Sequence, residues 1–433
     1  MSFRRLAAIA LIFLGASLCW SVLGSSLMAR TGQFDARLDQ EVRLLWGGAH
    51  RQVAPNAWVL RPGIETETVD TKGEDGRVTR QEVRKAVVRS APAALQSTAA
   101  TADLDLEHRR KGLLWYSTYS VLFRATYTFL NPDPEARELR IRFPLPADDV
   151  LFDDFVFTLD GRPLSPGTEV SKEILATATA APGAPIVLDV QYRSRGLGTW
   201  TYAFSAVEKG VSQVRDFTLT MDTNFEEIDF PAGTVSPSEK TATPGGWRLT
   251  WRFANLISGQ AIGMTLPEKL NPGPFAARVT FFAPVGLLFF LAVMVMVGAT
   301  QGSPLHPMHY WFIAAAFFAF HLLLAYLVDH VSVNVAFGAA AAVSLGLVVS
   351  YLRVVTGMRH ALLRAGAAQL VFLVLFSYAF FFEGFTGLSI TIGAIVTLFV
   401  LMQMTARVSW DDVFAGGDRT TNPTTGAAHA SRG

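Results

Sequence analysis

The sequence predicts an integral membrane protein, in which a bundle of transmembrane helices carries one large, mainly β, extracytoplasmic domain. Half of the 433 residues are hydrophobic and only 17% are charged, so the mean hydropathy is positive at +0.30. The apolar residues lie in long runs near both ends of the chain and leave a soluble block between them. The net charge of +1 gives no reason to expect a nucleic-acid partner.

Six apolar stretches approach or exceed the roughly 20 residues that a helix needs to cross a bilayer. They are Leu6–Met28, Val279–Ala299, Met308–Val328, Val331–Leu352, Leu362–Phe382 and Gly387–Met404. The first stretch follows Arg4 and Arg5 and is longer than a usual signal-peptide core. We therefore expect an uncleaved anchor, with a cleaved signal peptide as the alternative.

These stretches divide the chain into four predicted parts. They are an N-terminal anchor (1–30), a soluble domain (31–277), a five-helix bundle (278–407) and a tail (408–433). The tail is rich in Gly, Thr and Ala, and we expect it to be disordered in the cytoplasm.

The distribution of basic residues predicts the orientation of the spans. With the N-terminus inside, the short outer loops around Asp329 and Glu383 carry no Lys or Arg, whereas the inner segments carry Arg4, Arg5, Arg353, Arg359, Arg364 and Arg407. All seven lysines lie between Lys72 and Lys269, in a long segment that can be translocated regardless of its charge. Both termini are therefore predicted to be cytoplasmic, and the large domain to lie outside.

The large domain shows the period-two alternation of half-buried strands, for example over Ser117–Phe129. The pair Asp160-Gly161 is a strong signal for a hairpin turn. At least seven such strands indicate an antiparallel sandwich or a large twisted sheet. Cys19 is the only cysteine, which excludes a disulfide within the chain.

The first part of this domain has a less regular pattern. Ala36–Leu45 and Arg80–Arg89 are predicted to be helical, and the Ala/Ser/Thr-rich Ala91–Ala102 to be a linker or long loop.

The chain lacks the standard catalytic motifs, including HExxH, GxSxG, GxxxxGK and GxGxxG. We therefore predict no catalytic residue, no metal site and no cofactor. The acidic run at 148–154 lacks the spacing of a calcium loop, so a hydrated turn is the favoured interpretation.

Ionisable residues in or beside the spans are the more informative candidates, because burying a charge in lipid is costly. His321 lies within a predicted span, Asp329 and His330 close that span at its outer end, and Glu383 ends the fifth span. We hypothesise that His321 pairs with Glu383 or Asp329 in a proton or ligand site. The alternative is a neutral histidine bonded to a helix carbonyl, with the other three residues in water.

Two further patterns remain open to interpretation. Gly338, Ala342 and Gly346 recur every four residues, which predicts a close helix contact, either within the bundle or with a partner. In the segment LHPMHYWF, His306 and His309 flank a proline that suits the first turn of a helix. These histidines make at most a weak metal pair, and they are candidates for a cytoplasmic partner contact.

This segment also carries a family resemblance. The segment resembles the CreD-type inner-membrane proteins, which are grouped under cell-envelope integrity. The residues that carry the resemblance are Leu305, His306, Pro307, Met308 and Tyr310, followed by Leu322–Leu324, Asp329 and His330. Weaker similarity extends to GLLWYSTYSVLFRATYTF, GWRLTWRFANLISG and ARVSWDDVF. The region from Gln33 to Pro92 departs from the family pattern.

The resemblance implies a non-enzymatic protein of the bacterial inner membrane that acts in envelope integrity or stress response. Its periplasmic domain is expected to be a sensing or interaction module. Its expected partners are membrane lipids and other envelope proteins. Two alternatives are a transporter or lipid-handling component, and a membrane-embedded enzyme that uses the outer His, Asp and Glu residues. The oligomeric state, the ligand and the signal do not follow from the sequence.

Overall fold

The computed structural model describes residues 3–72, 78–112, 114–147, 150–163, 172–205, 210–300, 305–382 and 384–406. The chain folds into two compact units. The first, which we call the helical unit, combines Met1–Asp35 with Leu270–Gly433, and the second, the sheet unit, is Ala36–Lys269. Asp148, Asp149, Glu383 and the tail from 407 onward lie outside the described residues.

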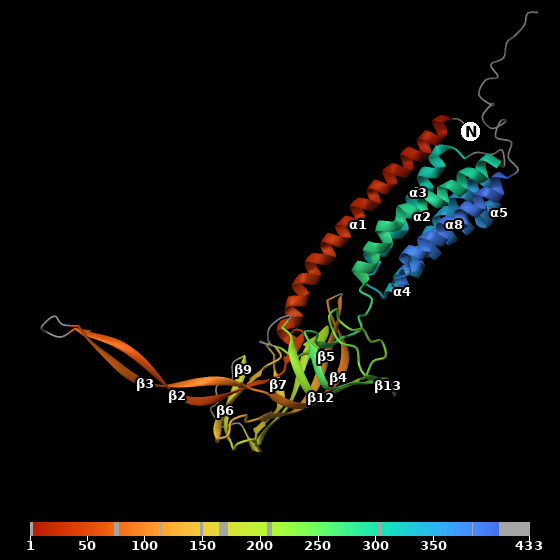
Figure 1. Cartoon of the computed structure of the whole chain (residues 1–433). Helices are drawn as coiled ribbons and strands as arrows, with labels where there is room; N and C mark the ends of the chain where they lie inside the picture. Colours follow the sequence, from red (N-terminus) through yellow and green to blue (C-terminus); the bar gives the residue numbers. More distant parts are fainter. Residues whose placement is uncertain are drawn as a thin grey trace, which may run out of the picture. The chain divides into compact units, whose positions relative to one another are not determined.

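Apolar helices make up the helical unit. Helix α1 (Phe3–Trp46) contributes residues to both units and includes the segment Ala36–Leu45 that was predicted to be helical. The remaining elements are α2 (Pro272–Thr300), α3 (Pro307–Leu327), α4 (Val333–Thr356), α5 (Met358–His360), η1 (Ala361–Gly366), α6 (Ala367–Gln369), η2 (Leu370–Leu375), α7 (Phe376–Tyr378), η3 (Ala379–Phe381) and α8 (Thr386–Thr405) (Figure 1).

Five helical segments among the described residues are long and apolar enough to cross a membrane. They are Arg4–Trp46, Pro272–Gly298, Pro307–Leu327, Val333–Thr356 and Met358–Phe381. The apolar part of α8, Gly387–Gln403, is shorter. These helices share one apolar core, in which Trp20 of α1 is fully buried.

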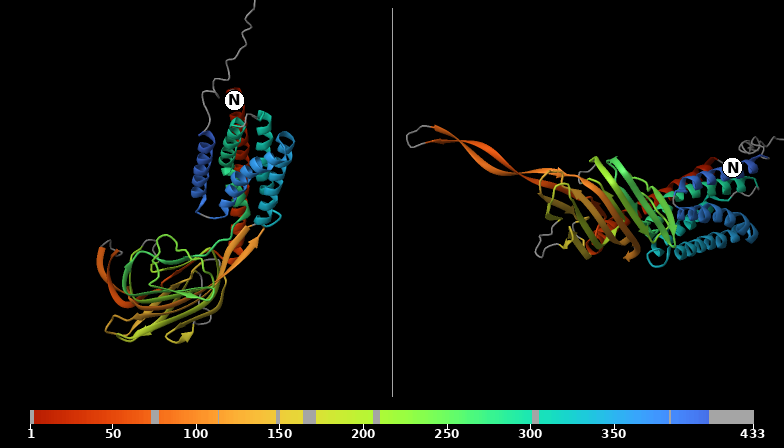
Figure 2. Two further views of the ribbon diagram at one scale, coloured as in Figure 1. Left: turned by 90° about the vertical axis from the view of Figure 1, so that its right-hand side faces the viewer. Right: turned by 60° about the horizontal axis from the view of Figure 1, so that its bottom comes forward.

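Three sheets make up the sheet unit (Figures 1 and 2). An eight-stranded sheet has the order β13 (Glu239–Thr243), β14 (Gly246–Ser258), β12 (Ser212–Thr223), β4 (Leu95–Lys111), β5 (Leu114–Leu130), β10 (Pro185–Leu197), β7 (Phe152–Leu159), β8 (Arg162–Pro163). A four-stranded sheet has the order β3 (Val78–Ala93), β2 (Asn56–Lys72), β6 (Arg137–Pro144), β9 (Glu173–Ala180), and a three-stranded sheet β1 (His50–Val53), β11 (Thr199–Ala203), β15 (Ile262–Thr265).

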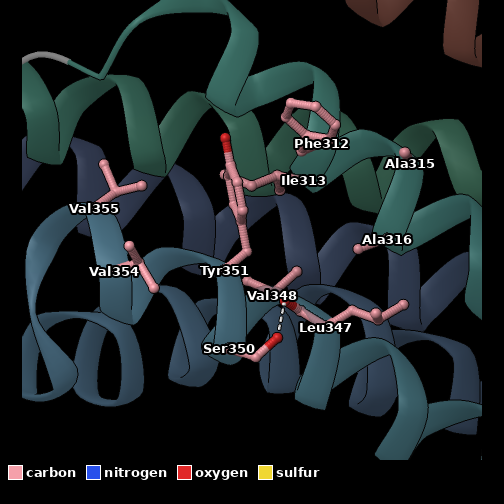
Figure 3. Close-up of a pocket in the computed structure, with 10 residues that line it drawn as sticks. All are labelled: Phe312, Ile313, Ala315, Ala316, Leu347, Val348, Ser350, Tyr351, Val354 and Val355. Atoms are coloured by element: carbon pink, nitrogen blue, oxygen red, sulfur yellow. Dashed lines mark hydrogen bonds between the residues drawn. The ribbon is translucent and has the colours of Figure 1, made fainter.

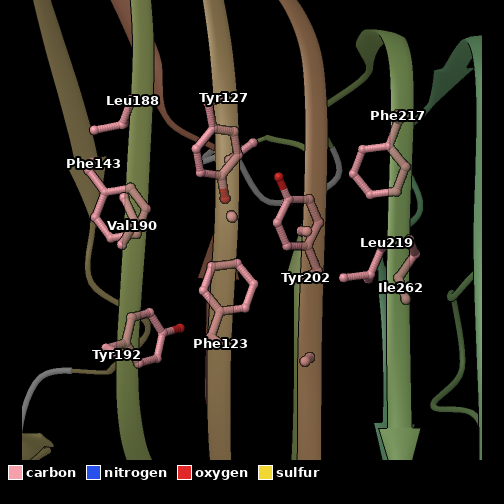
Figure 4. Packing of buried hydrophobic residues seen from close by; sticks show 14 of the residues in the cluster. Phe123, Tyr127, Phe143, Leu188, Val190, Tyr192, Tyr202, Phe217, Leu219 and Ile262 are labelled. Atoms are coloured by element: carbon pink, nitrogen blue, oxygen red, sulfur yellow. The ribbon is translucent and has the colours of Figure 1, made fainter. Parts of the chain in front are cut away.

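Most strand neighbours in these sheets are antiparallel, but the pairs β12–β4 and β1–β11 are parallel. The odd-numbered apolar residues of β5 point into a shared core, as the alternation predicted. Figure 4 shows Phe123 and Tyr127 there, packed with Tyr192, Tyr202 and Phe217.

The turn between β7 and β8 is the one that the sequence predicted. Asp160 and Gly161 both have positive φ, at 52° and 73°. A two-residue turn of this kind matches the natural twist of its flanking strands, and Gly adopts it without strain.

The predictions for two early segments were wrong. Arg80–Arg89 lies in strand β3 rather than a helix, and Ala91–Ala102 continues through β3 into β4 rather than forming a linker. The buried part of β4 carries small residues, among them Ala100 and Ala102, whose weak intrinsic strand preference is overridden by pairing with β5 and β12.

A two-stranded ribbon extends from the four-stranded sheet (Figures 1 and 2). Strand β2 pairs with β6 only from Asn56 to Leu60, but with β3 from Ala57 to Lys72. Beyond Leu60 the ribbon therefore consists of β2 and β3 alone among the described strands. An isolated two-stranded hairpin is only marginally stable in water, so a ribbon of this length that pairs with no further described strand is unusual.

A buried histidine ties three strands of the sheet unit together. His50 of β1 is 1% exposed. Its Nδ1 lies 2.8 Å from the hydroxyl of Tyr119, and its Nε2 lies 3.1 Å from the hydroxyl of Ser194. The Tyr119 hydroxyl donates to the carbonyl of Thr199 at 2.8 Å. A Cβ at Gly196 would overlap both the Tyr119 and His50 rings, so only glycine leaves room for this packing.

Burial lowers the pKa of His50 from its usual 6.5 to about 4. The unfolded chain therefore takes up a proton near pH 6.5, while the folded protein takes it up only near pH 4. Between these values, stability falls as the pH is lowered. We predict that the free energy of unfolding of the sheet unit drops by about 2 kcal/mol from pH 7 to pH 5 through this group.

Denaturant unfolding of the purified protein at both pH values measures this loss. His50→Gln is expected to remove most of it, whereas His108→Gln, a control at a partly buried histidine, is expected to keep it. An equal pH dependence in wild type and His50→Gln would contradict the assignment.

Candidate functional site

His321 of α3 is the most deeply buried ionisable residue among the predicted candidates, at 1% exposure. Its Nδ1 lies 3.0 Å from the carbonyl oxygen of Phe317 one turn earlier, which makes Nδ1 the donor and leaves Nε2 as an acceptor. Nε2 is buried and has no hydrogen-bond partner among the described residues. The geometry thus matches the carbonyl-bonded alternative for this histidine.

Trp20 of α1 packs against this histidine inside the helical unit. The two rings meet edge to face, with centroids 5.5 Å apart, and Phe318 and Phe320 complete the surroundings. The indole N–H of Trp20 is also buried without a described partner. The indole N–H of Trp20 and the Nε2 of His321 thus belong to two rings in contact, but no hydrogen bond joins these two atoms.

Asp329 pairs with a residue that the sequence interpretation did not consider. Its carboxylate lies 3.0 Å from the guanidinium of Arg30 on α1. The side chains of Arg30 and Asp329 are 38% and 22% exposed, so the pair contributes at most about 1 kcal/mol. The signal in the sequence was a single arginine just after the first apolar run, as expected for a side chain at a membrane boundary.

The three outer residues that the structure describes, His321, Asp329 and His330, do not gather into one site. His321 lies two turns before Asp329 on α3 and bonds its own helix, while Asp329 bonds Arg30. His330 is exposed in the turn after α3, where its backbone N–H donates to the carbonyl of Leu327. Glu383 lies outside the described residues, so its predicted pairing with His321 stays a prediction.

The segment LHPMHYWF begins α3. His306 is the N-cap, and its side chain accepts a hydrogen bond from the N–H of Met308, while Pro307 occupies the first turn. His309 lies 2.8 Å from the hydroxyl of Tyr351 on α4 and so helps to join the two helices. No group of three or more metal-ligating side chains occurs in the part of the chain that the structure describes.

The small-residue ridge of α4 makes no close packing contact with other described residues of the helical unit. Gly338, Ala342 and Gly346 are all exposed. A Cβ added at Gly338 or Gly346 would meet nothing within 4 Å. Of the two interpretations, a contact within the bundle is therefore not formed among the described residues.

Buried polar side chains also join α3, α4 and α6. The hydroxyl of Ser344 donates to the carbonyl of Ala316 at 2.6 Å, and the amide of Gln369 donates to Ser344 at 2.8 Å. Polar contacts of this kind add to van der Waals packing between membrane helices.

Two hollows open on the helical unit. An apolar one of about 560 Å³ lies between α3 and α4, lined by residues that include Phe312, Tyr351 and Val354 (Figure 3). A second hollow of about 600 Å³ is lined by apolar residues together with His360 and Arg364. The sequence interpretation counted Arg364 only toward orientation and left His360 out.

The sheet unit has one exposed apolar patch on its ribbon. Pro62 and Ile64 of β2 lie opposite Val88 and Ala86 of β3, and alternation puts all four on one face of the ribbon. Ile64 and Val88 are 67% and 70% exposed. We call these four residues the ribbon patch.

The base of the ribbon is anchored by charge. The guanidinium of Arg61 pairs with both carboxylate oxygens of Asp133, with Nε 2.8 Å from Oδ2, and Arg137 contacts the same carboxylate at 3.3 Å. These hydrogen bonds, chiefly that of Arg61, lower the pKa of Asp133. Within the acidic run at 148–154, Asp154 of β7 pairs with Arg193 of β10 at 3.2 Å.

We predict that His321→Leu leaves the stability of the helical unit unchanged or raises it slightly. Leucine fills a similar volume and removes a buried acceptor that has no partner, which is neutral or favourable. Ser344→Ala is the contrasting variant, because it strips Gln369 of its described partner and is expected to cost about 1–3 kcal/mol.

Thermal unfolding of both variants in detergent tests the comparison. A His321→Leu protein that unfolds earlier than Ser344→Ala would show that the histidine makes a contact beyond those described.

Comparison with solved structures finds only weak likenesses. An M1 zinc metallopeptidase of Deinococcus radiodurans matches at 10% identity over 72% of this chain and 94% of its own, with a TM-score of 0.27. A candidate nutrient-binding protein of Legionella pneumophila subsp. pneumophila str. Philadelphia 1 matches at 10% identity over 45% and 72%, also with a TM-score of 0.27. Scores this low carry no argument, and no curated protein matches the chain.

The family comparison is more informative. Residues 215–411 match the family model described as Inner membrane protein CreD. This segment holds the end of the sheet unit and nearly all of the helical unit that follows it. The match confirms, over these residues, the resemblance to the CreD-type inner membrane proteins that the sequence carries.

Proposed function

We propose that this protein maintains the bacterial cell envelope as a non-enzymatic inner-membrane component, and that its sheet unit is a periplasmic interaction module. The family match supports an envelope-related role in the inner membrane. The observation that carries the more specific proposal is the β2–β3 ribbon, which presents apolar side chains and free strand edges. Such edges and patches mark protein interaction surfaces.

The charges of the helical unit support the proposed orientation. Arg353, Arg359 and Arg364 lie at the end of the unit where α4 finishes, whereas the pair of Arg30 and Asp329 lies at the opposite end, where α3 finishes. Short loops rich in arginine face the cytoplasm. The chain leaves and re-enters the helical unit near the Arg30 end, so the sheet unit belongs on the periplasmic side in this proposal.

The ribbon patch limits the kind of partner. It is a narrow apolar strip between charged neighbours, with Glu65 and Lys85 paired on the opposite face. An apolar strip of this size suits a strand or helix of another envelope protein, which would cover the patch and pair with a free edge of β2 or β3.

We predict that a photoreactive residue at Ile64 crosslinks to one dominant envelope protein in intact cells. Glu65 is the matched control, because it is the adjacent residue and faces the other way. Mass spectrometry of the product identifies the partner. Equal crosslinking from both positions would contradict recognition by the ribbon patch.

A second arm of the experiment removes the patch. Ile64→Asp combined with Val88→Asp is expected to abolish the crosslink and to raise detergent sensitivity to that of the deletion strain, at unchanged protein abundance. Val83→Asp places the same charge on the opposite face of β3 and is expected to keep wild-type resistance. Wild-type resistance in the double variant would refute the proposed role of the ribbon.

A further inference from the structure

The second hollow of the helical unit combines an apolar floor with a cationic rim. Met294 of α2, Leu305 before α3 and Leu352 of α4 line it and are buried, at 6%, 9% and 1% exposure. His360 and Arg364 line it as well, the first exposed and the second half-buried. A volume of about 600 Å³ is within the range of ligand pockets.

The guanidinium of Arg364 has no counter-ion within the described protein. Neither His360 nor Arg364 makes a side-chain hydrogen bond or ion pair with a described residue. Asp329 is the only carboxylate among the described residues from 270 to 406, and it is paired with Arg30 at the other end of α3. A half-buried guanidinium beside apolar residues is well suited to hold a phosphate or carboxylate.

The backbone that carries Arg364 is held in place. Gly357, with φ of 85°, turns the chain sharply between α4 and α5. The η1 segment after α5 is π-helical, a rare geometry that is frequent at functional sites. Its residues Ala361 and Ala365 are buried, so Arg364 extends from a packed turn rather than from a loose loop.

The apolar hollow between α3 and α4 adjoins the cationic one, since Val355 lines both. Its walls are formed by side chains such as Phe312, Leu347 and Val354, and among its lining residues Ser350 bonds its own helix carbonyl (Figure 3). A molecule with a charged head and a long apolar tail would satisfy both hollows together.

We propose that this end of the helical unit binds one phospholipid with an anionic headgroup. The headgroup phosphate contacts Arg364 and His360, and an acyl chain lies against the apolar residues of α3 and α4. Basic pockets between transmembrane helices bind headgroups of this class. Free phosphate shares the headgroup chemistry, but it would leave the apolar floor uncovered.

Native mass spectrometry of the full-length protein in detergent tests this proposal with three probes. They are dioctanoyl phosphatidylglycerol, dioctanoyl phosphatidylcholine and inorganic phosphate. We expect the anionic lipid to bind at least tenfold more tightly than the other two. We expect Arg364→Gln to weaken it roughly tenfold, as the loss of a charge-assisted contact predicts, and His360→Gln to weaken it by a smaller factor.

Arg359→Gln is the matched control, because this arginine precedes His360 on the same helix and does not line the hollow; it is expected to bind like wild type. Arg364→Lys is expected to retain an intermediate affinity, which separates loss of charge from loss of folding. Equal binding of both lipids, tight binding of inorganic phosphate, or equal loss in Arg359→Gln and Arg364→Gln would each overturn the proposal. The outcome is independent of the ribbon experiments, which concern the sheet unit.

Discussion

Helix α1 is held beside α2 and α3 at the end of the helical unit where the chain departs for the sheet unit, and the proposed arrangement depends on this contact. Gly273 of α2 approaches Thr31 so closely that a Cβ would lie 2.7 Å from its hydroxyl oxygen. Leu27, Ala277 and Ala325 pack together beside it. The partly exposed ion pair of Arg30 and Asp329 lies at the same end of the unit and adds at most about 1 kcal/mol.

The chain passes between the two units at two points, after Asp35 and before Leu270, and both points lie at this end of the helical unit. The opposite end carries Arg353, Arg359 and Arg364, and its described residues include no carboxylate. The helical unit is thus asymmetric in both charge and connectivity. The proposed orientation follows from that asymmetry. Of the two proposed binding surfaces, the ribbon patch belongs to the sheet unit and the hollow beside Arg364 belongs to the helical unit.

Much of the helical and strand content could be predicted from the sequence, because apolar runs and period-two alternation report burial directly. The predicted span Met308–Val328 and the helix α3 (Pro307–Leu327) differ by one residue at each end. The strands at 78–111 could not be predicted, because Ala, Arg and Lys have weak strand preferences and their strand state depends on distant pairing.

The candidate sites were less predictable, since they depend on contacts between residues far apart in sequence. His321 and Asp329 were recognised as candidates, but their contacts Trp20 and Arg30 come from α1, some 300 residues earlier. The hollow beside Arg364 is lined by residues of α2, α4, α5 and η1 together with Leu305, and these lie up to 71 residues apart in the sequence. The ribbon patch required the register of β2 against β3, which alternation alone does not supply.

In the proposed orientation the sheet unit faces the periplasm, while the arginine-rich end of the helical unit faces the cytoplasm. Single cysteines in a Cys19→Ser background test it, with Thr241→Cys on exposed β13 and Met358→Cys at the arginine-rich end. We predict that a membrane-impermeant maleimide labels Thr241→Cys in intact spheroplasts and Met358→Cys only after permeabilisation. Labelling of Met358→Cys but not Thr241→Cys in intact spheroplasts would contradict it.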